Sequence, residues 1–226
     1  MKNIVRSYLI FVLGVYFLSA GIVFIVRSML GTTPISSINY VLSLNTPLSL
    51  GTCTFLVNVA LILGQFWLIR DRWSRRDAVE ILLQVPFSLL FGLFIDLNMW
   101  LTHAVHPQHY AMSLLLLAVG CLAQAVGIVL EIKPRVAMMS GEGFVKYASQ
   151  RYGKDFGRLK VAFDISLVTA AAILSYLCAH RIEGVREGTF VAALATGFLV
   201  NFLNRRIMTR SMLRRIVPER IRRTVH

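Results

Sequence analysis

The chain has 226 residues, of which 56% are hydrophobic and 15% are charged, and it carries a formal net charge of +13. Its mean hydropathy of +0.66 lies outside the range of soluble globular domains. This composition excludes an ordinary water-soluble enzyme or binding module and indicates an integral membrane protein.

Six stretches of the chain carry few or no charged residues and are long enough to cross a membrane. A transmembrane helix needs about 20 predominantly apolar residues. In chain order the stretches are 8–26, 52–69, 81–101, 110–130, 161–179 and 188–204. They predict an all-α membrane protein with six transmembrane helices. The first stretch lacks a small-residue cleavage site, so we interpret it as a retained span and not as a signal peptide.

The basic residues predict the orientation of these helices. The segment 70–76 contains four arginines, whereas the loop 98–111 has no Lys, Arg, Asp or Glu. The tail 205–223 holds eight arginines, and Lys2 and Arg6 precede the first helix. Because loops rich in Lys and Arg stay in the cytoplasm, both termini are expected there. The same topology accounts for the positive charge, so we do not predict a nucleic-acid partner.

The tail 207–226 mixes apolar residues with its arginines at nearly helical spacing. Its apolar positions are Ile207, Met208, Met212, Leu213, Ile216 and Val217. This pattern is typical of an amphipathic helix that lies on anionic lipid headgroups. A tail that serves only to set the topology is equally compatible with it.

The second half of the chain resembles the first when it is shifted by 106 residues. The shift aligns Gly14 with Gly120, Gly21 with Gly127, Arg27 with Lys133, Gly51 with Gly157 and Asn58 with Asp164, and after a one-residue deletion Gly92 with Gly197 and Asp96 with Asn201. Each copy contains three spans, an odd number, so the second copy enters the membrane from the opposite side. We therefore predict two inverted three-helix repeats, 1–104 and 105–206, followed by the tail 207–226.

Glycines spaced seven residues apart occur on one face of the first and fourth predicted spans. These are Gly14 and Gly21 in the first span and Gly120 and Gly127 in the fourth. Small residues on one face let two helix backbones approach each other. The two spans are expected to cross near the axis that relates the repeats.

Each repeat also contains a short helix that cannot cross the membrane by itself. The segment 31–42 reads GTTPISSINYVL, in which Thr33 is placed to cap a helix whose first residue is Pro34. The segment 139–148 reads MSGEGFVKYA, with Ser140 as the expected cap. Both segments predict re-entrant or interfacial helices of about ten residues. If both dip into the membrane, their N-termini meet near the midplane.

The short helices predict a binding site, because a helix N-terminus attracts anions. Arg27 and Lys133 precede the two helices and add positive charge, although basic residues at the end of a span often only reach the headgroups. The candidate substrate-binding residues are Arg27, Thr32, Thr33, Ser36, Asn39, Lys133, Ser140 and Glu142.

Four further polar positions are candidates for proton coupling or for hydrogen bonds between helices. They are Asn58, Asp96, Asp164 and Asn201. A carboxylate at membrane depth must be paired, protonated or hydrated, and Asp164 can pair with Lys160 or with Lys133. A third acid, Glu131, lies at the cytoplasmic end of the fourth span and is expected in a surface ion cluster with Lys133 and Arg135.

Motifs for catalysis or metal binding give little support for an enzyme. His103, His106 and His109 recur at every third position, but Pro107 interrupts a helix there and no acid or cysteine is near in sequence. No GxSxG, HExxH or phosphate-binding loop occurs. We expect no catalytic residue, no metal and no cofactor.

The segment 31–37, the residues Leu50, Gly51 and Thr52, and the following span with Asn58 resemble the bacterial YczE/YitT-type family of small membrane proteins. The YczE-like branch is the more similar, because the soluble domain of the YitT branch has no counterpart here. The resemblance implies a bacterial plasma-membrane protein and supplies no substrate.

These observations lead to three functional hypotheses. The first is a small transporter or channel that moves an anionic or carboxylate-bearing solute through a site between the repeats. The second is a membrane scaffold or regulator that acts through its basic tail, and the third is a lipid-handling protein. Membrane lipids are expected partners, and a homo-oligomer is compatible with the sequence.

Overall fold

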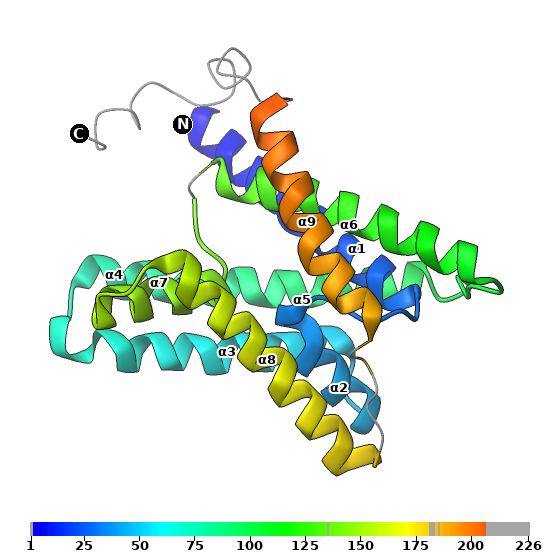
Figure 1. Cartoon of the computed structure of the whole chain (residues 1–226). Coiled ribbons are helices and arrows are strands. Elements are labelled where there is room, and N and C mark those ends of the chain that lie inside the picture. The colour runs from blue at the N-terminus through cyan, green and yellow to red at the C-terminus, as the bar shows by residue number, and fades with distance from the viewer. Residues whose placement is uncertain (1, 135, 181–183, 185, 207–226) are drawn as a thin grey trace.

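The computed structural model describes residues 2–134, 136–180, 184 and 186–206, and all regular elements within these ranges are helical. In chain order they are α1 (Lys2–Arg27), η1 (Pro34–Ser36), α2 (Ser37–Asn45), α3 (Leu50–Ile69), η2 (Arg70–Arg72), α4 (Arg75–Leu82), α5 (Gln84–Leu101), α6 (Tyr110–Ile132), α7 (Ser140–Tyr152), α8 (Phe156–Ala179) and α9 (Glu187–Arg206). Figure 1 shows their arrangement. The predicted tail 207–226 lies outside the described residues.

Five helical segments of the described chain are long and apolar enough to cross a membrane. They are Val5–Arg27, Leu50–Ile69, Arg75–Leu101, Tyr110–Ile132 and Phe156–Ala179. The sixth predicted span, 188–204, forms α9, but its apolar part is the shorter segment Glu187–Leu203. At 1.5 Å per residue that part covers roughly 26 Å, less than the ~30 Å of a typical hydrocarbon core. The structure is therefore helical and suited to a membrane, as predicted. Five helices of the described chain, and not six, are long enough to span it.

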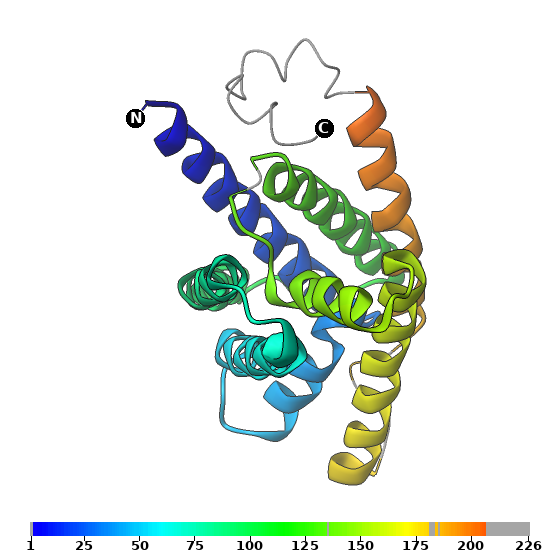
Figure 2. The same ribbon diagram turned by 90° about the vertical axis from the view of Figure 1, so that its left-hand side faces the viewer.

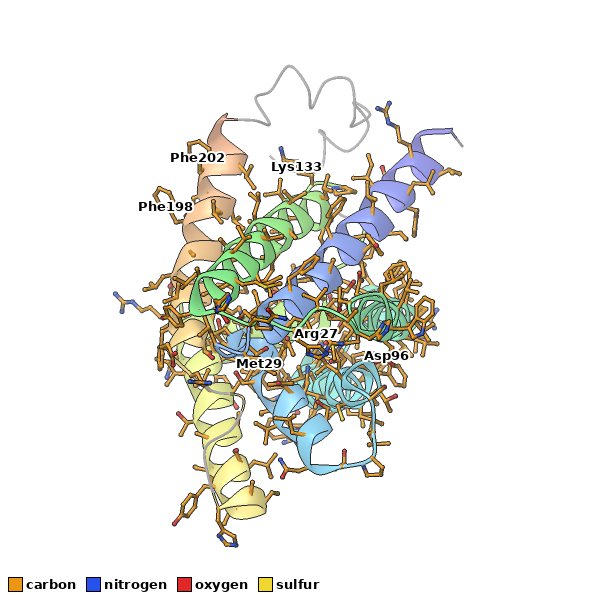
Figure 3. The ribbon with its side chains drawn as sticks, turned by 90° about the vertical axis from the view of Figure 1, so that its right-hand side faces the viewer. Arg27, Met29, Asp96, Lys133, Phe198 and Phe202 are labelled. Carbon is orange, nitrogen blue, oxygen red and sulfur yellow. The ribbon has the colours of Figure 1, made fainter. Side chains whose placement is uncertain are left out.

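The packing of polar and apolar side chains suits a lipid environment. Large apolar side chains are exposed along the spans, among them Leu63, Trp100, Leu115, Ile165 and Leu177. On α9, Phe198 and Phe202 project away from the neighbouring helices (Figure 3). Gln65 and Gln84 are instead buried between helices, where they bond to each other. In a bilayer, exposed apolar side chains cost little and buried polar groups bond across helices.

Helices α1 and α6 cross antiparallel to each other through the four glycines predicted for this contact. A Cβ atom added to Gly21 would lie 2.5 Å from the backbone nitrogen of Gln124, and one added to Gly127 would lie 2.4 Å from that of Leu18. Gly14 contacts the backbone of Gly127, and Gly120 contacts that of Gly21. The glycine spacing therefore predicted this crossing correctly.

The remaining helices pack around this crossing. Helix α2 packs on α8 and α7 packs on α3, while α1 contacts α5 and α6 contacts α9. Helices α3 and α5 are tightly packed, since a Cβ atom on Gly51 would lie 2.1 Å from the carbonyl oxygen of Gly92. Helices α8 and α9 instead extend toward opposite ends of the molecule (Figures 1 and 2). At Gly197 on α9, no described atom lies within 4 Å of an added Cβ.

The glycine crossing makes a stability prediction. Gly21→Ala is expected to destabilise the protein by roughly 1–3 kcal/mol, because the new Cβ collides with backbone that cannot rotate away. Gly197→Ala is the matched control, since its Cβ meets open space. Thermal unfolding of the purified protein in detergent measures both. Equal melting temperatures for the two variants would contradict the role of the crossing.

Candidate functional site

A cavity of about 740 Å³ lies where the two short helical segments meet α1, α3 and α6. Its walls are mainly apolar, with Leu18, Ile22, Ile35, Phe91, Ile128 and Met139 among the lining residues. Polar lining residues come from η1, α2, α3, α6 and the start of α7. The cavity also reaches α4 through Arg76 and Glu80, and the start of α8 through Phe156.

Helix α7 begins opposite the middle of α3 and runs toward the end of α3. At the beginning of α7, the Ser140 hydroxyl donates a hydrogen bond to Asn58 Oδ1 at 2.6 Å. Near its other end, Arg151 donates to the carbonyl oxygen of Leu68 at 2.8 Å. The cap position is occupied by Met139, one residue before the predicted cap, because the first helical hydrogen bond runs from the N–H of Gly143 to the carbonyl oxygen of Met139.

The other short segment starts beside the first residues of α7. Thr33 precedes Pro34, the first residue of η1, as predicted, but its hydroxyl donates to the Ser36 hydroxyl at 3.1 Å and accepts no hydrogen bond from a helix N–H. A Cβ atom on Gly141 would lie 2.2 Å from Ile35 Cδ1, so the two segments touch where both begin. Each therefore presents its first turn to the cavity.

Two buried glutamines hold α7 against α3 and α5. Gln65 and Gln84 donate to each other's side-chain oxygens at 2.8 and 2.9 Å, and Gln65 also donates to the carbonyl oxygen of Ser140 at 3.1 Å. Gly143 leaves room for this pair, because a Cβ there would lie 2.8 Å from Gln65 Oε1. Sequence reasoning missed the pair, although a glutamine inside an apolar span was a usable signal.

Two carboxyl groups, Glu131 and Glu142, line the cavity and are close enough to interact electrostatically. Glu131 is only 7% exposed, so the predicted surface ion cluster with Lys133 is wrong. Helix α6 continues to Ile132, which turns Glu131 inward above Gly14. Arg135 lies outside the described residues. Burial raises the pKa of the Glu142 carboxyl, with Lys160 acting against this rise and Asp164 adding to it.

Two amide atoms at the cavity have no hydrogen-bond partner within the described part of the chain. They are Asn39 Oδ1 and Asn58 Nδ2, which belong to side chains 3% and 7% exposed. Buried polar atoms are normally satisfied, so such exceptions often mark a place for water or a ligand. Asn39 supplies an acceptor and Asn58 a donor.

The predicted cations do not come together at the cavity. Arg27 donates to the carbonyl oxygen of Met99 at 2.8 Å and to Thr102 Oγ1 at 3.3 Å, so it caps the last turn of α5. Lys133 follows the far end of α6, and burial lowers the pKa of its ammonium. Figure 3 shows Lys133 near one end of the molecule and Arg27 well below it. Their helix positions are about 20 Å apart along the crossing.

The other predicted site residues divide into lining and structural positions. Ser36, Asn39, Ser140, Glu142 and Asn58 line the cavity. Thr32 and Thr33 are buried beside it, and the N–H of Thr32 donates to Thr189 Oγ1 at 3.2 Å.

The predicted coupling carboxylates have protein partners. Asp96 accepts hydrogen bonds from the Ser49 hydroxyl at 2.7 Å and from the N–H of Gly51 at 2.8 Å. Asp164 pairs with Lys160, one of the two partners expected for it. Asn201 lies exposed on α9. Within the described ranges, no group of three or more His, Cys, Asp or Glu side chains is arranged to hold a metal ion.

Comparison with known proteins places the chain in a family. Residues 5–205 match a family of unknown function, DUF6198. The chain belongs to the DUF6198 family. No curated protein and no solved structure matches it. The match does not name the YczE/YitT-type family, so that resemblance stays a prediction.

The position of Arg27 predicts a structural role for its side chain. Arg27→Gln is expected to lower the free energy of unfolding by about 1–3 kcal/mol, because α5 loses a charged donor at its last carbonyls. Arg70→Gln is the control, since Arg70 makes an exposed ion pair with Asp71 at 3.4 Å and such pairs contribute about 0–1 kcal/mol. Thermal unfolding compares them. If Arg27→Gln leaves the melting temperature unchanged, the capping role is refuted.

The environment of Glu142 predicts a pH-dependent stability. Its pKa is raised in the folded protein, so the folded state keeps this proton to a higher pH than the unfolded state does. Stability is therefore lost as pH rises from the ordinary carboxyl range through the folded pKa. Glu142→Gln lacks this loss, and its melting temperature should exceed that of the wild type by a margin that grows with pH.

The exposed acid Glu187, whose partner Arg186 lies at 3.7 Å, provides the control. Glu187→Gln should follow the wild-type melting temperature across the same pH series. A Glu142→Gln curve parallel to the wild-type curve would show that ionisation of Glu142 has no cost in the folded state.

Proposed function

We propose that the chain is a small membrane transporter that moves a solute through the cavity between two inverted repeats. The observation that carries this proposal is the cavity itself, which lies where the first turns of both short helices meet. Transporters with inverted repeats bind their solute at such a junction of broken helices. Non-helical backbone at membrane depth is tolerated where it is covered by protein or lines a wet cavity. The segments that lead into η1 and α7 fit this description as re-entrant hairpins.

The helix contacts support the inverted repeat, with α9 as the sixth span. Under the shift of 106 residues, the contact of Gly14 with Gly127 becomes that of Gly120 with Gly21, and both are present. The same shift turns α2 on α8 into α7 on α3, and α1 on α5 into α6 on α9. The first residue of α1 and the last of α9 lie toward the same end of the molecule, as an even number of spans requires (Figures 1 and 2).

The starts of α3 and α8 support the same relation. Ser49 caps α3 by accepting a hydrogen bond from the N–H of Thr52, and Asp155 caps α8 by accepting one from the N–H of Arg158. The shift of 106 residues aligns both capping residues and both donors. Two helices that begin with the same geometry at aligned positions are expected of a repeat.

One contact differs between the halves, and this difference favours alternating access. We call the contact of α3 with α5 at Gly51 and Gly92 the first crossing, and the aligned positions Gly157 and Gly197 of α8 and α9 the second crossing. The first crossing is closed, whereas the second is open. By the distribution of basic residues, the first faces outward and the second faces the cytoplasm. This arrangement corresponds to an inward-open state.

The residues that line the cavity differ from those on which an anionic solute was predicted. An anionic solute was predicted from Arg27 and Lys133, and neither lines the cavity. The carboxyl groups of Glu131 and Glu142 do line it. The scaffold alternative depends on the tail 207–226, outside the described residues.

Alternating access predicts that the second crossing closes. In a variant without Cys53, Cys121 and Cys178, the pair Gly157→Cys and Gly197→Cys should form a disulfide under mild oxidation. The same cross-link should protect a third cysteine, Ser36→Cys in the cavity, from a membrane-impermeant maleimide added at the cytoplasmic side. Labelling of inside-out vesicles before and after oxidation measures this protection.

The control moves one cysteine along the same helix. Phe190→Cys lies on α9 about 10 Å from Gly197 at 1.5 Å per residue, so with Gly157→Cys it should not cross-link. Failure of the Gly157 and Gly197 pair to cross-link, or cross-linking that leaves Ser36→Cys equally reactive, refutes alternating access.

A further inference from the structure

The charges that face the cavity leave two carboxyl groups without a cationic partner. Glu131 receives a hydrogen bond from the backbone N–H of Met139, but it makes no ion pair with any described basic residue. Glu142 likewise has no ion pair within the described part of the chain, and the nearby ammonium of Lys160 is bound by Asp164. The interior of the cavity is therefore acidic.

The charged residues at the edge of the cavity do not neutralise this interior. Glu80 lines the cavity and is paired with Lys146 of α7. Arg76 also lines it, but its residue is exposed at the start of α4. The pairs of Glu80 with Lys146 and of Asp164 with Lys160 each sum to zero. A solute that passes Arg76 meets two acids and no buried cation among the lining residues.

Two buried carboxyl groups in a mainly apolar cavity are costly to ionise unless a positive charge accompanies them. A bound cation supplies that charge for one of them, and the remaining proton stays on the pair. The apolar walls, formed by residues such as Ile22, Ile35, Phe91 and Ile128, suit a hydrophobic body on the same molecule.

The unpartnered amides are a separate observation that points to a ligand. Asn39 Oδ1 is an acceptor that an ammonium N–H can reach within the lining, and Asn58 Nδ2 is a donor for a hydroxyl or carbonyl oxygen. Their placement on α2 and α3 differs from that of the acids on α6 and α7. The polar groups thus surround an apolar cavity from four elements.

We infer that the cavity binds an apolar solute with a positively charged amine or onium group, which Glu131 and Glu142 neutralise. This inference rests on the transport function proposed above and replaces the anionic solute by a cationic one. Binding of the cation displaces a proton from the pair of acids, since an adjacent positive charge favours their ionised form. Other titratable groups facing them are Glu80 and Lys146, and Lys160 and Asp164.

The test uses two ions of the same shape and opposite charge. Tetraphenylphosphonium and tetraphenylborate are titrated onto the purified full chain in nanodiscs of neutral lipid, and tetrapropylammonium serves as a smaller cation. We expect both cations to bind and the borate to bind at least tenfold more weakly. Cation affinity should fall as pH is lowered from 8 to 5, because protons compete for the acids.

Charge-removing variants connect the affinity to the site. Glu131→Gln and Glu142→Gln should each weaken binding of tetraphenylphosphonium at least tenfold and reduce its pH dependence, whereas Glu187→Gln should bind as the wild type does. The melting temperature of each variant confirms that it is folded. Asn39→Leu keeps both acids, so the pH dependence of cation binding should be retained in this variant.

Three results overturn the inference: neither cation binds, the borate binds as tightly as the phosphonium, or both Gln variants bind like the wild type. Because binding is measured at equilibrium, it is independent of transport. If cation binding depends on Glu131 but the second crossing never closes, the transport function is refuted and the binding site is retained. A closing crossing without cation binding refutes the site and retains the transporter.

Discussion

The crossing of α1 and α6 determines where the cavity forms. At this crossing, Gly14 and Gly21 lie against the backbone of α6 with no side chain between them. After α1 the chain turns back toward the centre of the molecule and forms η1. After α6 it turns back in the same way and forms α7. Because the two helices are antiparallel, the returning segments arrive from opposite ends and meet, with Ile35 against Gly141. A wider crossing would separate the two first turns and remove the common wall of the cavity.

Some of the buried polar groups hold helices together, and others line the cavity. Gln65, Gln84 and Ser140 satisfy one another and fix α7 against α3, as a buried network must to be stable. Asn39 and Asn58 lie at the cavity instead, where the hydrogen bonding of their amide groups within the described chain is incomplete. Incomplete satisfaction costs stability, and it is commonly retained only where a ligand or water completes it. The cavity is therefore one place where the described chain tolerates that cost.

The sequence predicted features that depend on local pattern and not those that depend on a distant partner. The glycine spacing predicted the α1–α6 crossing, and the Thr-Pro pair predicted the start of η1, because both signals act within a few residues. Arg27 was assigned to the site, yet its long side chain reaches the end of α5, which lies far away in sequence. Glu131 was assigned to the surface because its burial depends on how far α6 continues and how it rotates against α1.

The aligned positions of the two crossings carry hydrogen-bonding groups of exchanged character, although only the first crossing forms the bond. In the first crossing the cap Ser49 donates to Asp96, so the hydroxyl is the donor and the span residue is the acceptor. In the second, the aligned cap is the carboxylate Asp155, an acceptor, and the aligned span residue is Asn201, whose amide can donate. Each pair is complementary, although donor and acceptor have changed places. In the alternating access proposed above, this complementarity would let Asn201 donate to Asp155 when α9 packs against α8.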